Sequence, residues 1–202
     1  MDSTFDEARL REPFVVAVLI ATHNRPELLA ERSLPSVDHQ SRRPDVVVVV
    51  DDSDDSFRER NRGIVASSSL HAIYLPNTRA RGASGAWNTG LAWLSAHFEA
   101  PEMVFVAVLD DDDGWEERHL EVCLETAERE RLDMAIPGLV RHDAECAAGR
   151  RQTLARSLDE GALLTGNPHI QGSNLFVRLL VLLEAGLFDE ALPSTTDRDL
   201  CL

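Results

Sequence analysis

The segment 103–113, MVFVAVLDDDD, joins seven apolar residues directly to four aspartates. Seven apolar residues are enough for a strand, but a membrane span needs about 20. A strand that is apolar throughout is typical of a parallel sheet with helices on both faces. Ligands of such sheets bind at the carboxyl ends of the strands. The segment therefore predicts a fold class and also the place of a site.

Other apolar runs alternate with amphipathic stretches, which predicts a three-layer α/β domain with a mostly parallel, mixed sheet. The expected strands are 14–20, 45–50, 71–75, 103–109, 134–140 and 171–177. The expected helices are 56–65, 85–98, 116–131, 178–185 with Gly186 as its cap, and one that starts at Pro26 and is kinked or ended by Pro35. Residues 141–167 are mixed in character and are expected to be rich in loops.

The composition limits the class of protein and its partners. A chain of 202 residues fits one domain, which we place at residues 14–202 after a polar N-terminal extension at 1–13. The net charge is −15 and the chain contains no lysine, which argues against nucleic acid as a partner. The three cysteines are far apart without metal-ligand spacing, which predicts unpaired thiols and a cytoplasmic protein. A transmembrane segment is not expected, because no apolar run approaches the length of about 20 residues that it needs.

The four aspartates at 110–113 give the strongest signal for a metal site. Adjacent carboxylates repel one another unless a cation neutralises them, and Mn²⁺ and Mg²⁺ prefer oxygen ligands. Because side chains alternate along a strand, Asp110 and Asp112 are expected to point the same way. A cation would also let this acidic chain hold a diphosphate. The alternative is a solvated loop that caps a helix starting near Glu116.

A second acidic cluster, DDSDD at 51–55, follows the valine run at 46–50. One of its carboxylates is a candidate for hydrogen bonds to a nucleotide base or ribose, and the alternative is a solvated turn. The loop with Arg79, Arg81, Gly82 and Gly85 leads into a helix whose free N–H groups suit phosphate oxygens. The alternative there is an ordinary helix entry with surface arginines.

Five segments, in order, resemble one known family. They are VVAVLIATHNRPELLAERSLPSVDHQ (15–40), VVVVVDDSDD (46–55), NTRARGASGAWNTGL (77–91), VAVLDDDDGW (106–115) and GSNLFVRLLVLLEAGLFDEALPSTTDRDL (172–200). Each resembles a segment of the family 2 glycosyltransferases, which have the Rossmann-like GT-A fold. The resemblance covers nearly the whole chain and implies transfer of a sugar, with inversion, from a nucleotide sugar to an acceptor hydroxyl.

The resemblance also implies roles for individual residues. Thr22 and His23 would line the nucleotide pocket, with Asp51 or Asp52 on the base or ribose. Asp110 would lie near the ribose, and Asp112, with Asp110 as a further candidate, would bind Mn²⁺ or Mg²⁺. Arg81 and Asn88 lie in the matching donor-side segment. By resemblance alone, the preferred donor is a UDP-sugar, and the acceptor is a saccharide or another hydroxyl compound.

Asp197 occupies the position of the family's catalytic base, which would take the proton of the acceptor hydroxyl. The family usually has Glu before this base and the chain has Thr196, so Asp199 is an alternative base. Asp197 as the cap of a short helix is the structural alternative. Because acceptor-recognition structure would normally follow residue 202, the domain is expected to be truncated at its C-terminal end. The competing functions are a catalytically impaired nucleotide-sugar and metal-binding module and, with less support, a nucleotidyltransferase.

Overall fold

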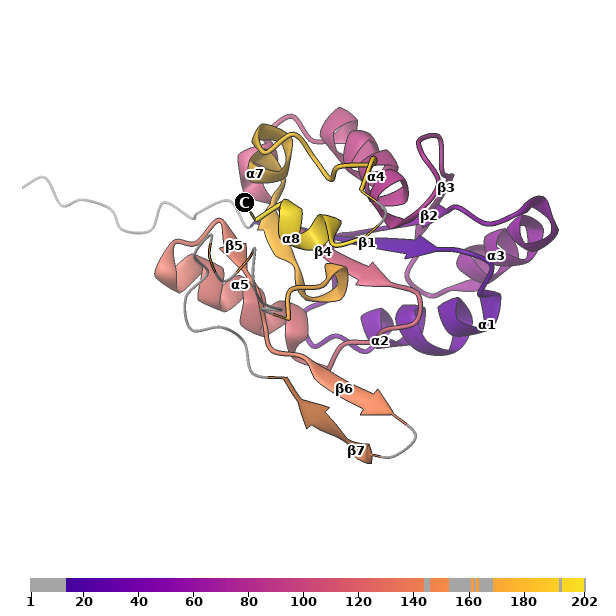
Figure 1. Ribbon diagram of the computed structural model, residues 1–202, viewed down its shortest axis with the longest axis horizontal. Coiled ribbons are helices and arrows are strands. Elements are labelled where there is room, and N and C mark those ends of the chain that lie inside the picture. Colours follow the sequence, from indigo (N-terminus) through magenta and orange to yellow (C-terminus); the bar gives the residue numbers. More distant parts are fainter. Residues whose placement is uncertain are drawn as a thin grey trace, which may run out of the picture.

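The computed structural model describes residues 14–143, 146–152, 161, 163, 169–192 and 194–201. Its central element is a six-stranded sheet with the strand order β3-β2-β1-β4-β8-β5 (Figure 1). In chain order its strands are β1 (Val15–Thr22), β2 (Val46–Asp51), β3 (Ile73–Pro76), β4 (Val104–Asp110), β5 (Met134–Ala135) and β8 (Phe176–Arg178). The four strands predicted before residue 110 are all present, with ends that differ by one or two residues.

The topology of the sheet fixes where a ligand can bind. Strands β1 to β4 pair in parallel, whereas β8 is antiparallel to both of its neighbours, β4 and β5. The chain runs from β1 outward to β2 and β3 and then crosses to β4 on the other side of β1. Such a reversal leaves a crevice beyond the carboxyl ends of the two central strands. Because β8 is antiparallel, the segment before it also lies at this edge.

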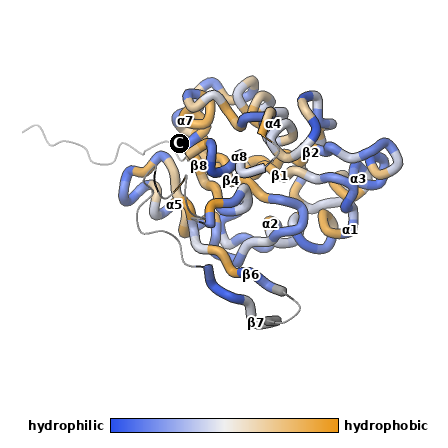
Figure 2. Tube along the Cα trace, viewed as in Figure 1, coloured by the Kyte–Doolittle hydropathy of each residue, from blue (hydrophilic) through white to orange (hydrophobic). Residues whose placement is uncertain are grey.

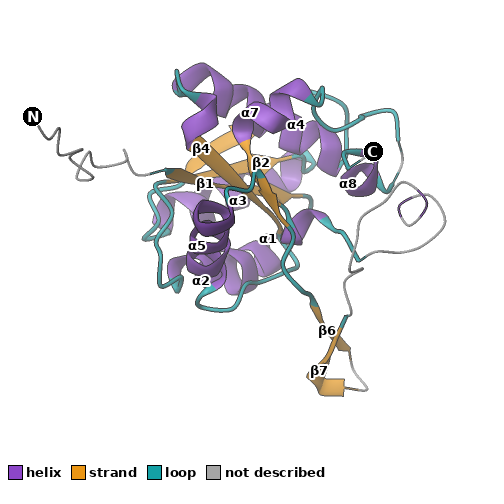
Figure 3. Cartoon of the chain, turned by 90° about the vertical axis from the view of Figure 1, so that its left-hand side faces the viewer, coloured by secondary structure: helices purple, strands orange, loops and turns teal. Residues whose placement is uncertain are grey.

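Helices cover both faces of the sheet (Figure 3). Buried residues of α4 (Ala83–His97) and α7 (Leu179–Glu184) join the apolar cluster on one face. The cluster on the other face includes residues of α2 (Leu34–Asp38), α3 (Asp55–Ser67) and α5 (His119–Glu130). This arrangement confirms the predicted three-layer α/β sandwich with a mostly parallel mixed sheet.

The alternation of side chains along the central strands builds the two clusters. On β1, Leu19 belongs to the cluster that α4 covers, and its neighbour Ile20 belongs to the cluster on the opposite face. Both side chains are fully buried. Figure 2 shows the apolar residues gathered on the central strands and on α7. Burial on both faces explains why these strands are apolar at nearly every position.

The first helical region consists of α1 (Pro26–Leu28), a π-helical turn (η1, Leu29–Ser33) and α2. The helix does not end at Pro35, which was one of the two expected outcomes, because Pro35 is the second residue of α2, and a π-helical turn interrupts the regular α-helix just before it. Proline disturbs an α-helix partly because it lacks the N–H that pairs with the carbonyl four residues earlier. Here the preceding turn pairs over five residues, as Leu34 N does with Leu29 O, so the missing donor is bypassed.

The segment 134–140 is not one strand as expected. Its first two residues form β5 in the central sheet. Its last residue, Val140, begins β6 (Val140–Asp143), which pairs with β7 (Cys146–Arg151) in a separate hairpin. The hairpin projects from the body of the molecule in Figures 1 and 3. Pro137 and Gly138 separate the two strands because proline lacks a ladder donor and glycine weakens a strand.

The expected strand 171–177 was also partly wrong, because β8 starts only at Phe176. A 3-10 turn (η3, Gly172–Asn174) precedes it after a short gap. The Asn174 side chain closes this turn by accepting a hydrogen bond from Gln171 N at 2.8 Å. Its amide Nδ2 donates to Pro137 O at 2.9 Å. The turn brings Gly172 and Ser173 to the carboxyl end of β4.

Some predictions fall outside the described residues, namely the N-terminal extension 1–13 and the side chain of Cys146. The other two cysteines, Cys123 and Cys201, are free thiols. Within the part of the chain that the structure describes, no helix combines the length and the apolar character needed to cross a membrane.

Candidate functional site

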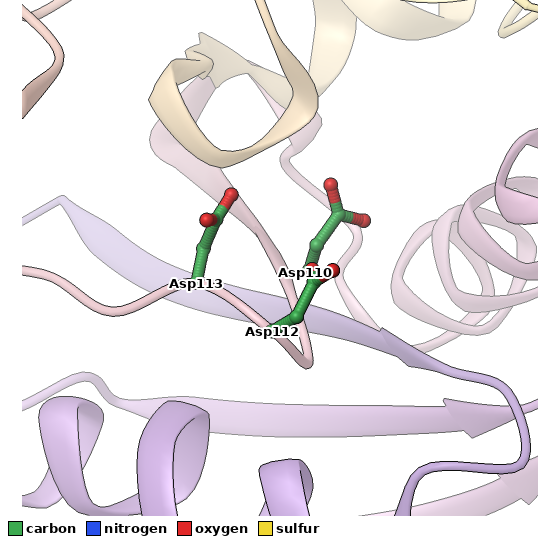
Figure 4. Close-up of side chains that lie close together, drawn as sticks. All are labelled: Asp110, Asp112 and Asp113. Atoms are coloured by element: carbon green, nitrogen blue, oxygen red, sulfur yellow. The ribbon is translucent and has the colours of Figure 1, made fainter. Parts of the chain in front are cut away.

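A tight turn at the end of β4 brings three aspartates together. Asp113 N donates to Asp110 O at 3.2 Å, so the chain turns back instead of continuing as a strand. One carboxylate oxygen from each of Asp110, Asp112 and Asp113 lies within 4.8 Å of the other two (Figure 4). We refer to these three residues as the aspartate triad. Asp110 and Asp112 do come together, but through a turn instead of strand alternation, and the turn adds Asp113.

The triad has the chemistry of a site for a hard divalent cation. It offers three carboxylate oxygens, the ligand type that Mg²⁺ and Mn²⁺ prefer. Burial and the charges of the neighbouring aspartates raise the pKa of Asp110 to about 7. A cation would relieve this repulsion, so the residues fit a metal ion. The alternative that the aspartates cap the next helix was wrong, because α5 starts at His119 with Arg118 as its N-cap.

The fourth aspartate of the run, Asp111, points into the protein and is fully buried. It accepts hydrogen bonds from Thr22 Oγ1 at 2.7 Å and His23 N at 3.2 Å. Arg25 pairs with Asp111 at 2.6 Å and with Asp112 at 2.5 Å. Asp111 therefore joins the loop after β1 to the turn after β4, directly across the crevice between the two strands.

The two aspartates at the end of β2 organise the neighbouring loops. Asp51 is fully buried, and its carboxylate accepts hydrogen bonds from Ser53 N, Asn61 Nδ2 and Tyr74 OH at 2.7–3.0 Å. Asp52 accepts from Asn77 Nδ2 and Gly82 N, both at 2.8 Å. The exposed His23 ring lies beside it, with Nδ1 2.9 Å from Asp52 O. Of the two, Asp52 is the residue next to His23 and the loop before α4.

The two donor-side residues predicted in and before α4 lie in different environments. Arg81 is exposed and forms an ion pair with Asp54 at 3.0 Å. Asn88 is buried, and its Nδ2 donates to Phe188 O and to Glu190 Oε1, both at 2.8 Å. Asn88 thus anchors the segment after α7 instead of facing the crevice.

Asp197 lines a pocket of about 310 Å³ beside the start of α4. Burial raises the pKa of Asp197, and backbone N–H groups, including that of Gly172, partly offset this rise. Asp199 is exposed and is absent from the pocket lining. The alternative that Asp197 caps a helix was wrong, since Thr195 is the N-cap of α8 (Thr196–Asp199). The pocket is lined by Arg81, Gly82, Ala83, Ser84, Trp87, Glu190, Ala191, Leu192, Ser194, Thr195, Thr196 and Asp197.

Gly172 connects this pocket to the aspartate triad. A Cβ atom at Gly172 would lie 2.5 Å from Trp87 Cζ2 and 3.5 Å from Asp110 Oδ2, so only glycine fits there. The next residue, Ser173, accepts a hydrogen bond from Asp110 N at 3.0 Å through its Oγ. The triad, the Trp87 ring and Asp197 therefore lie around one short stretch of backbone. A second cavity of about 340 Å³, between α2 and α3, contains none of the predicted site residues in its described lining.

Sequence reasoning assigned no role to several residues of this site, which are Arg25, Trp87, Gly172 and Ser173, and it included Asp111 and Asp113 only as members of the four-aspartate run. Of that run, Asp111 turns inward and is not part of the triad. The run of four aspartates contained the signal for Asp113, because a turn brings together residues that alternation separates. No comparable signal existed for Arg25 or Gly172. Arg25 pairs with Asp111 and Gly172 contacts Trp87, and each of these partners lies 85 or more positions away in the sequence.

Comparisons with known proteins agree with this architecture. The model of glycosyl transferase family 2 matches residues 17–182. The galactofuranosyltransferase GlfT1 of Mycolicibacterium smegmatis is 37% identical over 101 residues, which are 50% of this chain and 30% of that protein. The chain therefore spans less than a third of this relative.

Solved structures resemble the chain over 93% of its length. S. aureus TarS in complex with UDP-GlcNAc has a TM-score of 0.66 at 19% identity, and the match covers 52% of that chain. The mannosyltransferase PcManGT from Pyrobaculum calidifontis, in complex with GDP-Man and Mn²⁺, has a TM-score of 0.63 at 19% identity and is covered to 51%. At these identities the likeness shows the fold. Together with the family match, it shows that the chain belongs to glycosyl transferase family 2 and has the GT-A fold.

Proposed function

We propose that this chain is the donor-binding and catalytic core of a glycosyltransferase. It would transfer a sugar from a nucleotide diphosphate sugar to an acceptor hydroxyl, with inversion at the anomeric carbon. The observation that carries this proposal is the contact point at Gly172, where the aspartate triad and the pocket of Asp197 meet. A leaving-group site and a candidate base must lie this close together for a single displacement.

We place the diphosphate of the donor next to the aspartate triad. Asp110, Asp112 and Asp113 would hold a divalent cation, which would supply positive charge to balance that of the leaving diphosphate. The net charge of −15 would otherwise repel such a ligand. PcManGT, which shares the fold, is described with GDP-Man and Mn²⁺, and this supports Mn²⁺ or Mg²⁺ here. The exposed Arg81 at the pocket rim is a further cation for the donor phosphates.

Asp197 is the proposed base. Its carboxylate takes the proton of the acceptor hydroxyl while that oxygen forms a bond to the anomeric carbon. The bond from the anomeric carbon to the diphosphate oxygen breaks on the opposite face, which inverts the configuration. The raised pKa of Asp197 strengthens it as a proton acceptor. Because Asp199 is exposed and does not line the pocket, we assign the role to Asp197.

The nucleoside would lie over the loops that follow β1 and β2. Thr22 and His23 are fixed beside the triad by Asp111, and Asp52 lies next to His23. Asp51 would shape this region from within, because hydrogen bonds inside the protein occupy its side chain. Asn88 would instead hold the segment after α7, which contributes Glu190 to the pocket of Asp197. We propose a UDP-sugar as the donor, supported by TarS, which shares the fold and is described in complex with UDP and with UDP-GlcNAc. The proposed acceptor is a saccharide hydroxyl.

The test is the Asp197→Asn variant, which keeps the shape of the side chain and removes the base. We expect donor transfer or hydrolysis with Mn²⁺ to fall by about 10²–10⁴-fold, as for loss of a general base. Binding of UDP measured by calorimetry should stay the same. The exposed Asp199→Asn variant is the matched control and should keep the wild-type rate. A wild-type rate in Asp197→Asn would exclude this mechanism.

A second candidate is a module that binds a nucleotide sugar without turnover. Thr196, at the position where the family usually has Glu, favours this candidate. The same assays separate the two functions. If the wild type binds UDP with Mn²⁺ but shows neither hydrolysis nor transfer to any saccharide acceptor, the chain is a binding module.

A further inference from the structure

Trp87 combines deep burial with an unused hydrogen-bond donor. Its side chain is 4% exposed, and its indole Nε1 has no hydrogen-bond partner among the residues that the structure describes. A buried N–H without a partner destabilises a folded chain, so most are paired. The other indole donor of the site, Trp115 Nε1, follows this rule by donating to Ser173 O at 2.8 Å. The missing partner of Trp87 therefore points to a group outside the described part of this chain.

The surroundings of the ring limit the direction from which a partner can approach. Gly172 packs against the ring edge at Cζ2 and Cη2. Phe188 packs beside it, with 4.8 Å between the ring centroids. Trp87 also lines the pocket of Asp197. The structure describes no acceptor for the N–H, and the pocket is a part of the ring's surroundings that the described residues do not fill.

The position of the pocket indicates which part of a ligand would enter it. The transferred sugar must lie between the diphosphate and the base, and Trp87 lies beside Gly172, the residue that adjoins both Asp110 of the triad and Asp197. Gly172 contacts the Trp87 ring, lies close to Asp110 and offers a backbone N–H to Asp197. A volume of about 310 Å³ is near the lower limit of about 300 Å³ for ligand pockets, which suits one sugar ring.

We infer that the indole N–H of Trp87 donates a hydrogen bond to a hydroxyl of the transferred sugar and so selects the sugar of the donor. This inference rests on the proposed function. The polar side chains of Ser84 and Glu190 line the same pocket and are the candidates for contacts with the other hydroxyls. The nucleoside and diphosphate bind elsewhere in the crevice, so Trp87 contributes only to recognition of the sugar.

The test compares each nucleotide sugar with its own nucleotide diphosphate in the presence of Mn²⁺. Calorimetry with UDP-galactofuranose and UDP-GlcNAc against UDP, and with GDP-mannose against GDP, gives the affinity that the sugar adds. For a donor whose sugar adds affinity, Trp87→Phe should weaken binding about five- to tenfold, the value of one hydrogen bond. Affinity for the diphosphate alone should not change. The matched control is Trp93→Phe, on the same helix but with its ring stacked on the exposed His97 at 3.7 Å.

The possible results separate the inference from the proposed function. If Trp87→Phe keeps the affinity added by the sugar, or weakens the sugar and the diphosphate equally, the inference is wrong while the proposed function stands. The inference is also wrong if no sugar adds affinity to its diphosphate in the wild type. If the wild type binds no diphosphate at all, the proposed function fails, and the inference fails with it.

A second measurement keeps Trp87 intact, in case its replacement prevents folding. The variant W93F/W115F retains Trp87 as its single tryptophan. A hydrogen bond to the indole N–H should shift its fluorescence emission to longer wavelength when the selected nucleotide sugar is added, but not when the diphosphate is added. An emission that responds equally to both, or to neither while the sugar binds, contradicts the inference.

Discussion

Two adjacent residues, Asp111 and Asp112, have opposite surroundings. Asp111 is fully buried, whereas the Asp112 side chain is 43% exposed and belongs to the aspartate triad. Arg25 forms ion pairs with both carboxylates, so one guanidinium neutralises a buried aspartate and also contacts a candidate metal ligand. A cation bound to the triad must therefore share Asp112 with Arg25.

This arrangement predicts an unusual result for Arg25→Gln. Loss of the guanidinium leaves the buried Asp111 without its counter-ion, so the free energy of unfolding should fall by about 2 kcal/mol. The same loss removes a positive charge next to the triad, so Mn²⁺ should bind more tightly. In thermal denaturation we expect a lower melting temperature without metal and a larger increase on addition of Mn²⁺ than in the wild type.

The control for Arg25 is Arg32, which donates to the backbone oxygen of Asp112 at 2.5 Å and does not contact its carboxylate. Arg32→Gln should change neither the stability nor the response to Mn²⁺ by more than about 0.5 kcal/mol, as is usual for surface substitutions. Equal behaviour of the two variants would show that Arg25 has no special link to the triad.

At the residue scale, the sequence predicted the acidic end of β4 but not its geometry. A run of four aspartates after an apolar strand is visible in the sequence, and its position at the sheet edge follows from the strand. Which carboxylate turns inward depends on Thr22 and Arg25, which lie 89 and 86 positions before Asp111. Contacts across such a distance cannot be derived from local spacing.

At the scale of the elements, helix α5 begins at His119, and burial favours the neutral form of this histidine. His119 stacks on Trp115 with 4.4 Å between the ring centroids, and its buried Nε2 has no hydrogen-bond partner within the described ranges of the chain. Burial lowers the pKa of His119 to about 4. An unfolded chain, with a histidine pKa near 6.5, therefore binds this proton more strongly. Stability linked to His119 is complete above about pH 6.5 and is lost as the pH falls towards 4.

We predict that His119→Phe removes this part of the acid sensitivity. Phenylalanine keeps a ring against Trp115 but cannot be protonated. Between pH 7 and pH 4 the wild type should lose up to about 3 kcal/mol more of its free energy of unfolding than the variant does. Urea denaturation at several pH values measures this difference. His97→Phe, which also alters a histidine–tryptophan stack, measures the cost of the stack alone, and parallel pH curves for the wild type and His119→Phe would contradict the assignment.

Strands were predictable from the sequence where their apolar pattern alone identified them. The strands β1, β2 and β4 are apolar along their length because helices cover both faces, so their sequences alone identify them. The segments around β5, β6 and β8 were not predictable to the same extent. Pro137 interrupts one apolar run, and the Asn174 side chain replaces ladder hydrogen bonds with those of a turn in the other. Neither Pro137 nor the turn closed by Asn174 changes the pattern of apolar residues from which the strands were predicted.

At the scale of the whole molecule, the strand order brings the separate parts of the site together. The loops after β1 and β2, the turn after β4 and the segment before the antiparallel β8 all meet at one edge of the sheet. The register pairs Ala107 with Phe176, which places Ser173 opposite Asp110. The chain that forms this edge is strongly acidic, so an anionic donor should depend on a cation for binding.

The most direct test is calorimetry of UDP with Mn²⁺ and with EDTA, for the wild type, Asp112→Asn and Asp55→Asn. Asp55, with 94% of its side chain exposed at the start of α3, is the control for loss of an aspartate charge. We predict that UDP binds the wild type and Asp55→Asn only with Mn²⁺. Loss of one metal ligand in Asp112→Asn should weaken binding at least tenfold without loss of the fold. UDP binding that needs no metal, or that Asp112→Asn leaves unchanged, would contradict the role of the aspartate triad.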